Sequence, residues 1–259
     1  MGKSVFVQQW KNLCMNVPIN ILIQFNMINN IQSKKVLSAR STIYGAVSVL
    51  YSGPESKKFS MLMTDNLRTC VLDACLDLEK HINQKRNILL SQLFQKLIDK
   101  VDSLGLEKVK SEFVDIFGHT LSKEITPYAL EHLKNSDVFF RTQKLADLNG
   151  FYKAFGMEVE SIERADHIST QTEFISLLLL KELIAKENNL FEEKEICEKA
   201  LIDFQNEHFL DWVEIFSENM INYVDEEFYM LAGKFLYNFI QEEKFISEPI
   251  KQLTENVNK

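Results

Sequence analysis

Apolar residues recur along most of the chain at steps of three, four and seven, the spacing that places them on one face of an α-helix. One such series precedes a polar loop and consists of Val138, Leu145, Leu148, Tyr152 and Phe155. After the loop, apolar residues between 168 and 184 occupy several helical stripes. A helix that is apolar on most sides is expected to be buried on most sides. The pattern therefore predicts a central helix that starts at the loop 163–167, where the core meets water.

The same spacing predicts further helices over 38–51, 61–81, 86–101, 109–117, 191–205, 209–220 and 228–240. Helix-breaking sequences separate them, at 52–54, 83–86, 105, 118–120 and 188–190. Thr126 followed by Pro127 predicts one more helix start, with Thr126 as its cap. Glycine (8) and proline (4) are scarce, which favours long helices over an all-β fold. We expect an all-α, single-domain bundle of roughly ten helices.

Three segments are expected. Residues 1–36 form an N-terminal extension, 37–245 the helical domain, and 246–259 a polar tail. The apolar stretch 17–28 is interrupted by Asn and Gln and is too short and polar for a membrane span. It also lacks the small-residue cleavage site of a secretory signal. The extension could be an extra helix, a tail or translation from an upstream start.

Charge and motif content narrow the possible functions. With 29 Lys and Arg against 37 Asp and Glu, the net charge of −8 disfavours nucleic acid and anionic membranes and would suit a basic partner. The four cysteines form no CxxC pair, and the five histidines form no HExxH motif. No GxGxxG, GxxxxGK[ST] or GxSxG sequence occurs. We therefore expect no catalytic activity, no cofactor, no metal site and a reducing compartment.

The polar loop holds the most distinctive chemistry. Asp166 is placed to cap the following helix, with its carboxylate accepting a backbone hydrogen bond near Ser169. Together with Glu158, Glu160 and Glu163, it gives four carboxylates within a short stretch. His167 beside Glu163 or Glu173 leaves an acid–base or metal site open as an alternative.

Several motifs resemble a known family. The run Glu163-Arg-Ala-Asp-His-Ile168, followed by Glu173-Phe174, resembles the Glu-x-Pro-Asp-His…Glu-Phe signature of the TorD/DmsD/NarJ chaperones, with Ala165 in place of the usual proline. The turn at Pro54 and the segment from His208 to Trp212 are also similar to that family. The resemblance extends over about 38–240 and implies a TorD-like helical bundle.

The resemblance also implies a function. Such a protein is a cytoplasmic chaperone, monomeric or dimeric, that binds the twin-arginine leader or N-terminal segment of a molybdenum-containing reductase before cofactor insertion. It implies a peptide site at Glu163, Arg164, Asp166, His167 and Glu173. In this interpretation Asp166 contacts the leader arginines or caps the helix beside them, His167 orients the loop or donates a hydrogen bond, and Arg164 pairs with a nearby carboxylate.

Two further interpretations stay open. Trp212 is favoured as a core aromatic residue over a direct ligand contact, although it belongs to the same set of candidate binding residues. A helical adaptor with no metalloenzyme client would present the same groove without a preference for paired arginines.

Overall fold

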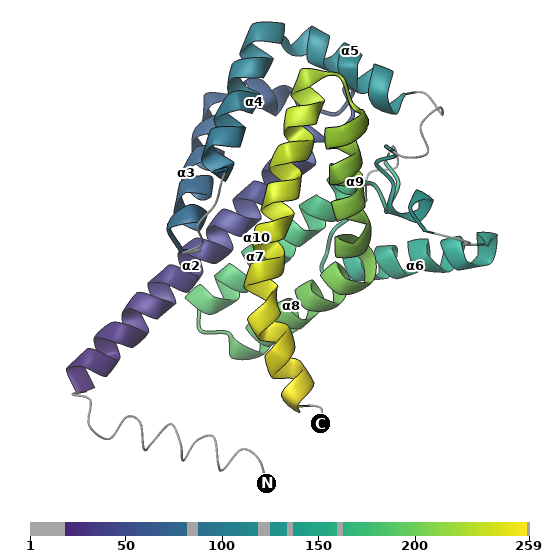
Figure 1. Cartoon of the computed structure of the whole chain (residues 1–259). Coiled ribbons are helices and arrows are strands. Elements are labelled where there is room, and N and C mark those ends of the chain that lie inside the picture. The colour runs from purple at the N-terminus through teal and green to yellow at the C-terminus, as the bar shows by residue number, and fades with distance from the viewer. Residues whose placement is uncertain (1–18, 82–87, 119–124, 134–136, 160–162, 258–259) are drawn as a thin grey trace.

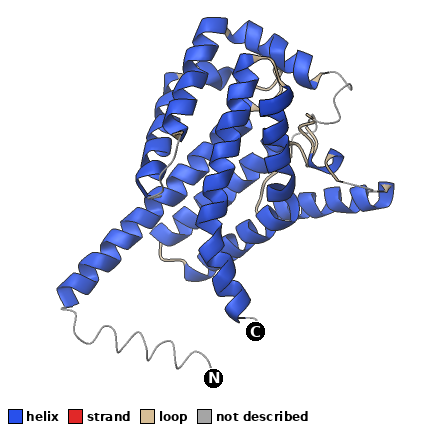
Figure 2. Cartoon of the chain, viewed as in Figure 1, coloured by secondary structure: helices blue, strands red, loops and turns tan. Residues whose placement is uncertain are grey.

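The computed structural model describes residues 19–81, 88–118, 125–133, 137–159 and 163–257. Nearly all of these residues are helical (Figures 1 and 2). The α-helices are α2 (Ile19–Leu50), α3 (Asp65–His81), α4 (Leu90–Leu104), α5 (Leu106–Phe117), α6 (Val138–Ala154), α7 (Ile168–Glu187), α8 (Phe191–Phe204), α9 (Leu210–Tyr223) and α10 (Glu227–Val257). Short helical turns occur at η1 (Phe59–Met63), η2 (Ala129–Glu131) and η3 (Gln205–Phe209).

The expected all-α class is confirmed. The described residues contain no strand, only an isolated bridge between Tyr128 and His167. They hold somewhat fewer α-helices than the ten or so expected. Within this part of the chain, none of the helices combines the length and apolar character needed to cross a membrane.

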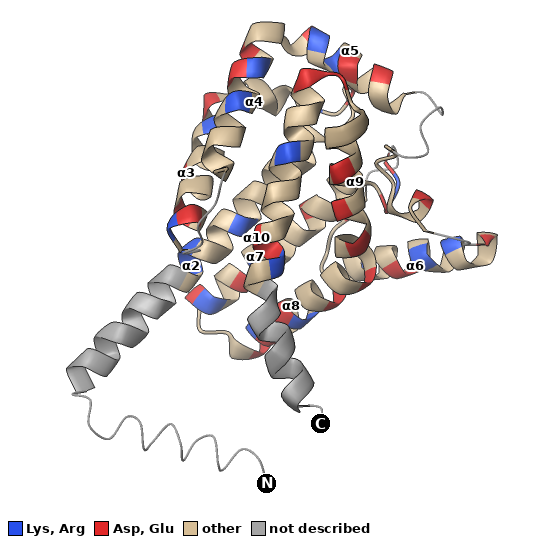
Figure 3. Cartoon of the chain, viewed as in Figure 1, with Lys and Arg blue, Asp and Glu red and all other residues tan. Residues whose placement is uncertain are grey.

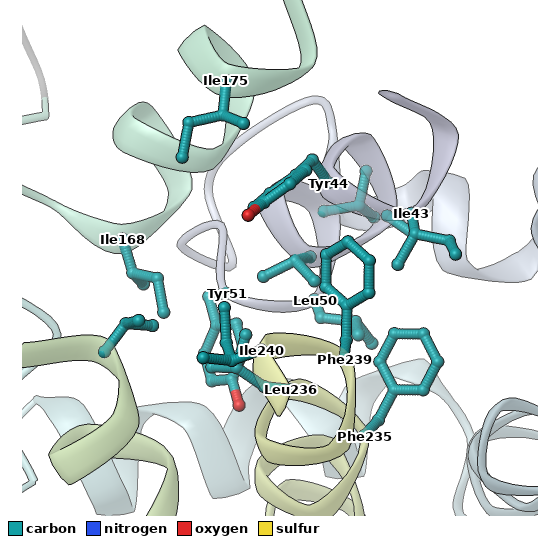
Figure 4. Close-up of a cluster of buried hydrophobic side chains, with 14 of the residues drawn as sticks. Ile43, Tyr44, Leu50, Tyr51, Ile168, Ile175, Phe235, Leu236, Phe239 and Ile240 are labelled. Atoms are coloured by element: carbon teal, nitrogen blue, oxygen red, sulfur yellow. The ribbon is translucent and has the colours of Figure 1, made fainter. Parts of the chain in front are cut away.

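Helix α7 is central, as its apolar pattern predicts. It packs against α2 and α8, while α10 packs against α9 and α4 (Figure 1). Only its first turns, 168–172, are buried all round. Farther along, the buried residues, Phe174, Ile175, Leu178 and Leu179 among them, lie on one face, and Leu180 and Ile184 are exposed, so the expectation of burial on most sides holds only for the start of the helix. Figure 4 shows the core where α2, α7 and α10 meet, with Tyr44, Tyr51, Ile168 and Phe239 converging from three helices.

A buried ion pair ties the first described helix to the last. Arg40 of α2 donates two hydrogen bonds to the carboxylate of Glu243 on α10, at 2.7 and 2.8 Å. Tyr44 and Gln205 also donate to this carboxylate, at 3.1 Å each. Burying a carboxylate is costly unless charge and hydrogen bonds compensate, and here both do.

Several helix boundaries differ from the sequence prediction. Helix α2 starts at Ile19 rather than near 38, and α10 continues to Val257 rather than ending near 240. The borders proposed at 36 and 245 thus fall inside helices, while the three-part division itself stays a prediction. The expected loop at 83–86 lies outside the described residues.

The predicted helix start at Thr126 and Pro127 is wrong. Residues 125–128 are not helical, and only the single turn η2 follows, without a side-chain cap. The reason is tertiary, because this segment pairs with the loop before α7. The carbonyl of Pro127 accepts from Ile168 N at 2.9 Å, and Ala129 N donates to Asp166 O at 3.0 Å.

Candidate functional site

The loop before α7 is fixed by its pairing with residues 127–130. Besides the two backbone hydrogen bonds, Tyr152 of α6 donates its hydroxyl hydrogen to the carbonyl of Ala165, at 2.6 Å. The positive φ of Gly156, 75°, turns the chain out of α6 toward this loop, a conformation that glycine adopts without strain. Three separate parts of the chain therefore set the position of residues 163–167.

Asp166 is the buried centre of this arrangement. Its side chain is 0% exposed and accepts from the backbone N of Leu130 at 3.0 Å. Arg164 donates to both carboxylate oxygens, from Nε at 2.9 Å and Nη2 at 2.8 Å. The expectation that Asp166 caps α7 is wrong, because this carboxylate turns toward Leu130 instead.

His167 is the residue that caps α7. Its Nδ1 accepts from the backbone N of Ser169 at 3.2 Å, and the side chain is 2% exposed. Burial lowers the pKa of His167 to about 3, and the positive charges of Arg164 and Lys58 act in the same direction. The imidazole is therefore neutral at pH 7 and free to accept, which agrees with its expected role of orienting the loop.

Arg164 pairs with carboxylates, as expected. In addition to Asp166, it contacts Glu131 at 3.3 Å, and its guanidinium lies 4.4 Å from the ring centroid of Tyr128. This side chain is 42% exposed, so it covers the buried carboxylate from the solvent side. Arg164, Asp166 and His167 thus form a structural clamp between the loop and residues 128–131.

Beside the clamp lies a pocket of about 430 Å³, here called the loop pocket. It is lined by three segments, namely residues 52–58 after α2, residues 157–159 with Glu163, and Ser169, Thr170 and Glu173 of α7. Four glutamates line it, against two lysines: Glu55, Glu158, Glu163, Glu173, Lys57 and Lys58. Lys58 forms an ion pair with Glu173.

The predicted site residues therefore fall into two groups. Glu163 and Glu173 line the loop pocket, whereas Arg164, Asp166 and His167 lie behind it in the clamp. Of the other expected carboxylates, Glu158 lines the pocket and Glu160 lies outside the described residues. Burial raises the pKa of Glu163, although a hydrogen bond from the Tyr128 hydroxyl at 3.4 Å opposes this shift.

Sequence reasoning missed the contribution of residues 52–58. The sequence indicates a helix stop at 52–54, but no periodic pattern indicates that Glu55, Lys57 and Lys58 meet the loop before α7. Contact between segments more than a hundred residues apart follows from the antiparallel packing of α2 on α7, which only the fold reveals.

Trp212 is a core residue on a different side of α7. It is 5% exposed and donates its indole hydrogen to Gln171 Oε1 at 3.1 Å and His208 O at 3.0 Å. It lines a second, smaller pocket of about 80 Å³, together with residues of η2, α6 and the π-helical turn η3. Its predicted part in peptide binding stays a prediction.

The geometry gives no support to a metal or acid–base centre at His167. Among the described residues, no group of three or more His, Cys, Asp or Glu side chains is arranged to hold a metal ion. The one histidine of the loop is buried, neutral and engaged as a helix cap.

Comparison with known proteins assigns the family. The family model described as "Nitrate reductase delta subunit" matches residues 81–218, which is just over half of the chain and includes the whole loop before α7. No curated protein and no solved structure matches the chain. The matched region, the clamp and the all-helical fold lead to one assignment: the chain belongs to the nitrate reductase delta subunit family, within the TorD/NarJ family of chaperones for molybdoenzyme maturation.

Proposed function

We propose that this protein is a cytoplasmic chaperone that binds the arginine-containing leader or N-terminal segment of a molybdenum reductase apo-subunit in the loop pocket. Holding that segment would delay export or assembly until the molybdenum cofactor has been inserted. The observation that supports this proposal is the excess of carboxylates over lysines around a pocket open beside the family's signature loop.

The pocket offers two kinds of contact. Glu55, Glu158 and Glu163 have no lysine or arginine paired with them among the described ion pairs, so they are available to a guanidinium. Each exposed ion pair contributes only about 0–1 kcal/mol. Most of the affinity must therefore come from burial of apolar peptide surface, to which Met157 and Val159 of the pocket wall contribute.

The geometry supports different roles in peptide binding for the residues of the predicted site. Glu163 and Glu173 are the residues proposed to contact the leader arginines, and a bound arginine would compete with Lys58 for Glu173. Asp166 acts indirectly, because Arg164 and Leu130 already occupy both of its oxygens. Arg164 and His167 keep Glu163 at the pocket edge by fixing the loop.

The test uses calorimetric titration of the full chain with a synthetic leader peptide of the host's own molybdenum reductase. We expect the Glu163→Gln/Glu173→Gln variant to weaken binding about tenfold at unchanged folding stability, since it removes two exposed ion pairs. Glu187→Gln, an exposed change at the far end of α7, is the matched control and should bind normally.

A second peptide separates the chaperone from a general helical adaptor. Replacing the paired arginines with lysines should weaken binding, because lysine cannot make bidentate contacts with a carboxylate. Equal affinity for both peptides would favour an adaptor without a molybdoenzyme client. Absence of binding to either peptide would reject the proposed function.

A further inference from the structure

The small pocket around Trp212 contains polar atoms that the protein leaves unused. It lies against the side of α7 that carries Gln171, whereas Thr170 and Glu173 of the same turns line the loop pocket. Its apolar wall is formed by Leu130, Leu133, Leu148 and Phe209. We call it the amide pocket.

Two residues that line this pocket each hold a buried nitrogen atom without a hydrogen-bond partner among the described residues. These atoms are Nε2 of Gln171, whose residue is 0% exposed, and Nε2 of His208, whose residue is 8% exposed. An unsatisfied buried polar group costs roughly 1–3 kcal/mol, so native structures seldom keep two of them at one pocket without a use.

The orientation of Gln171 is determined by its neighbour. The indole N–H of Trp212 can only donate, so the Gln171 atom that it meets at 3.1 Å must be the oxygen. The side-chain NH₂ of Gln171 is therefore the group left over, and it is a donor. A ligand for it must bring an acceptor.

His208 owes its position to the π-helical turn. Leu210 N donates to Gln205 O, five residues back, so the turn η3 holds one residue more than an α-helical turn. The same turn directs the carbonyl of His208 to the Trp212 indole, at 3.0 Å. π-turns of this kind are frequent at functional sites.

The charge environment of the amide pocket disfavours anionic ligands, because two carboxylates and one lysine line it. Burial and the positive charge of Lys144 lower the pKa of His208 to about 4, with Asp147 opposing, so the imidazole is neutral at pH 7. Glu207 and Asp211 at the rim repel anions, and the charged residues of α9 are all acidic (Figure 3). Glu207 Oε2 lies 3.8 Å from His208 Nε2, beyond hydrogen-bond distance.

We propose that this pocket binds a primary carboxamide, whose oxygen accepts from Gln171 and whose NH₂ donates to Nε2 of His208 in the tautomer that carries its proton on Nδ1. A carboxamide supplies an acceptor and a donor without charge on two separate atoms, which suits two separate nitrogen atoms, whereas a hydroxyl carries both functions on one oxygen. A volume of about 80 Å³ accommodates a group of this size. As the natural source of this carboxamide we assign an Asn or Gln side chain of the client segment. This assignment rests on the proposed function. The affinity of the pocket for a carboxamide does not depend on it.

The clamp connects the two pockets, because segments that it holds line both of them. Leu130 lines the amide pocket, and its backbone N is held by Asp166 of the clamp, while Glu163 of the same loop lines the loop pocket. A client segment that crosses the clamp could place arginines in one pocket and a carboxamide in the other.

The test is a titration of the full chain with acetamide, followed by NMR through the indole N–H signal of Trp212. The chain has two tryptophans, and the spectrum of Trp212→Phe identifies the signal. Acetone and acetate are the matched probes, because acetone lacks the donor and acetate carries a charge. We expect acetamide to bind at least about fivefold more tightly than acetone or acetate, which is the typical net contribution of one hydrogen bond to affinity.

Two variants complete the experiment. Gln171→Met keeps the side-chain volume and removes the donor, and should abolish the preference for acetamide. Leu133→Trp, at a partly exposed wall position, should block all three probes in a folded protein. Glu187→Gln, distant on α7, should behave like the unaltered chain.

Equal shifts with the three probes, or none with any of them, would mean that the pocket holds only water and would overturn the proposal. Because no client peptide is used, a failure here is distinct from a failure of leader binding. Conversely, loss of leader binding with the acetamide preference intact would reject the proposed function and keep the site.

Discussion

At the scale of single residues, the loop before α7 separates binding groups from structural groups. Glu163 and Glu173 face a pocket, while Asp166 and His167, only a few positions away, are sealed in the core. Substitutions at neighbouring positions should therefore have different effects on binding and on folding.

Asp166→Asn should destabilise the fold by about 1.5–3 kcal/mol, because it weakens the charge-assisted hydrogen bonds from Arg164, which keeps only Glu131 as its carboxylate partner. Urea unfolding followed by circular dichroism measures the change. Asp73→Asn, an exposed position on α3, is the control and should stay within about 0.5 kcal/mol. A loss of leader binding at unchanged stability would instead make Asp166 a direct ligand.

His167→Asn should make the protein less sensitive to acid. The folded-state pKa of His167 is about 3 against 6.5 for the free side chain, so the unfolded chain takes up the proton first. Stability is lost as pH falls from 6.5 toward 3, and Asn, which also caps helices, removes this loss. Unfolding free energies measured at pH 7 and pH 4 should differ less in the variant; an unchanged difference would contradict the assignment.

At the scale of helices, close packing rather than propensity decides what a position tolerates. Gly233 of α10 faces α9 so closely that an added Cβ would lie 2.6 Å from Met220 Cβ. Gly150 of α6 has no atom within 4 Å of such a Cβ among the described residues. The two glycines thus form a matched pair within helices.

Gly233→Ala should destabilise the protein by about 1–3 kcal/mol through overpacking. Gly150→Ala should stabilise it by about 0.5–1 kcal/mol, since alanine has the higher helix propensity. Thermal unfolding of both variants measures the two signs. Equal shifts in the same direction would show that α9 and α10 are not in close contact at Gly233.

The sequence predicts the helices well and the loops poorly, for a physical reason. The repeat of α9 reflects burial along that helix, so it identifies the element before the fold is known. The repeat of α6 also identifies a helix, although only Leu148 and Tyr152 of it are buried and Val138 is exposed. Thr126 with Pro127, and Asp166 before Ile168, follow good local rules that are overridden by hydrogen bonds between 127–130 and 166–168. The loop pocket likewise depends on residues 52–58, which only tertiary packing brings to the site.

At the scale of the whole molecule, the buried pair of Arg40 and Glu243 joins the first and last described helices, α2 and α10. Both side chains lie in the core, and Tyr44 and Gln205 complete the network. The pair therefore couples α2, which packs against α7, to α10, which packs against α9.

Arg40→Met should destabilise the protein by about 3–5 kcal/mol, because it leaves the Glu243 carboxylate buried without its cation. The double change Arg40→Met/Glu243→Met should recover most of this loss, since an apolar pair of similar volume carries no desolvation cost. Denaturant titrations of the single and double variants measure the coupling. Additive losses would show that the pair acts independently of charge.

The pairing of residues 127–130 with 165–168 also has a topological consequence. It closes the intervening chain, including the projecting helix α6, into an excursion whose two ends are fixed to each other (Figure 1). The entropy of closing such a loop grows only slowly with its length, by about 0.6 kcal/mol for each doubling. The outer part of this excursion, before Lys144, can therefore change in length at little thermodynamic cost, while Lys144, Leu148 and Tyr152 stay in place and both pockets keep their shape.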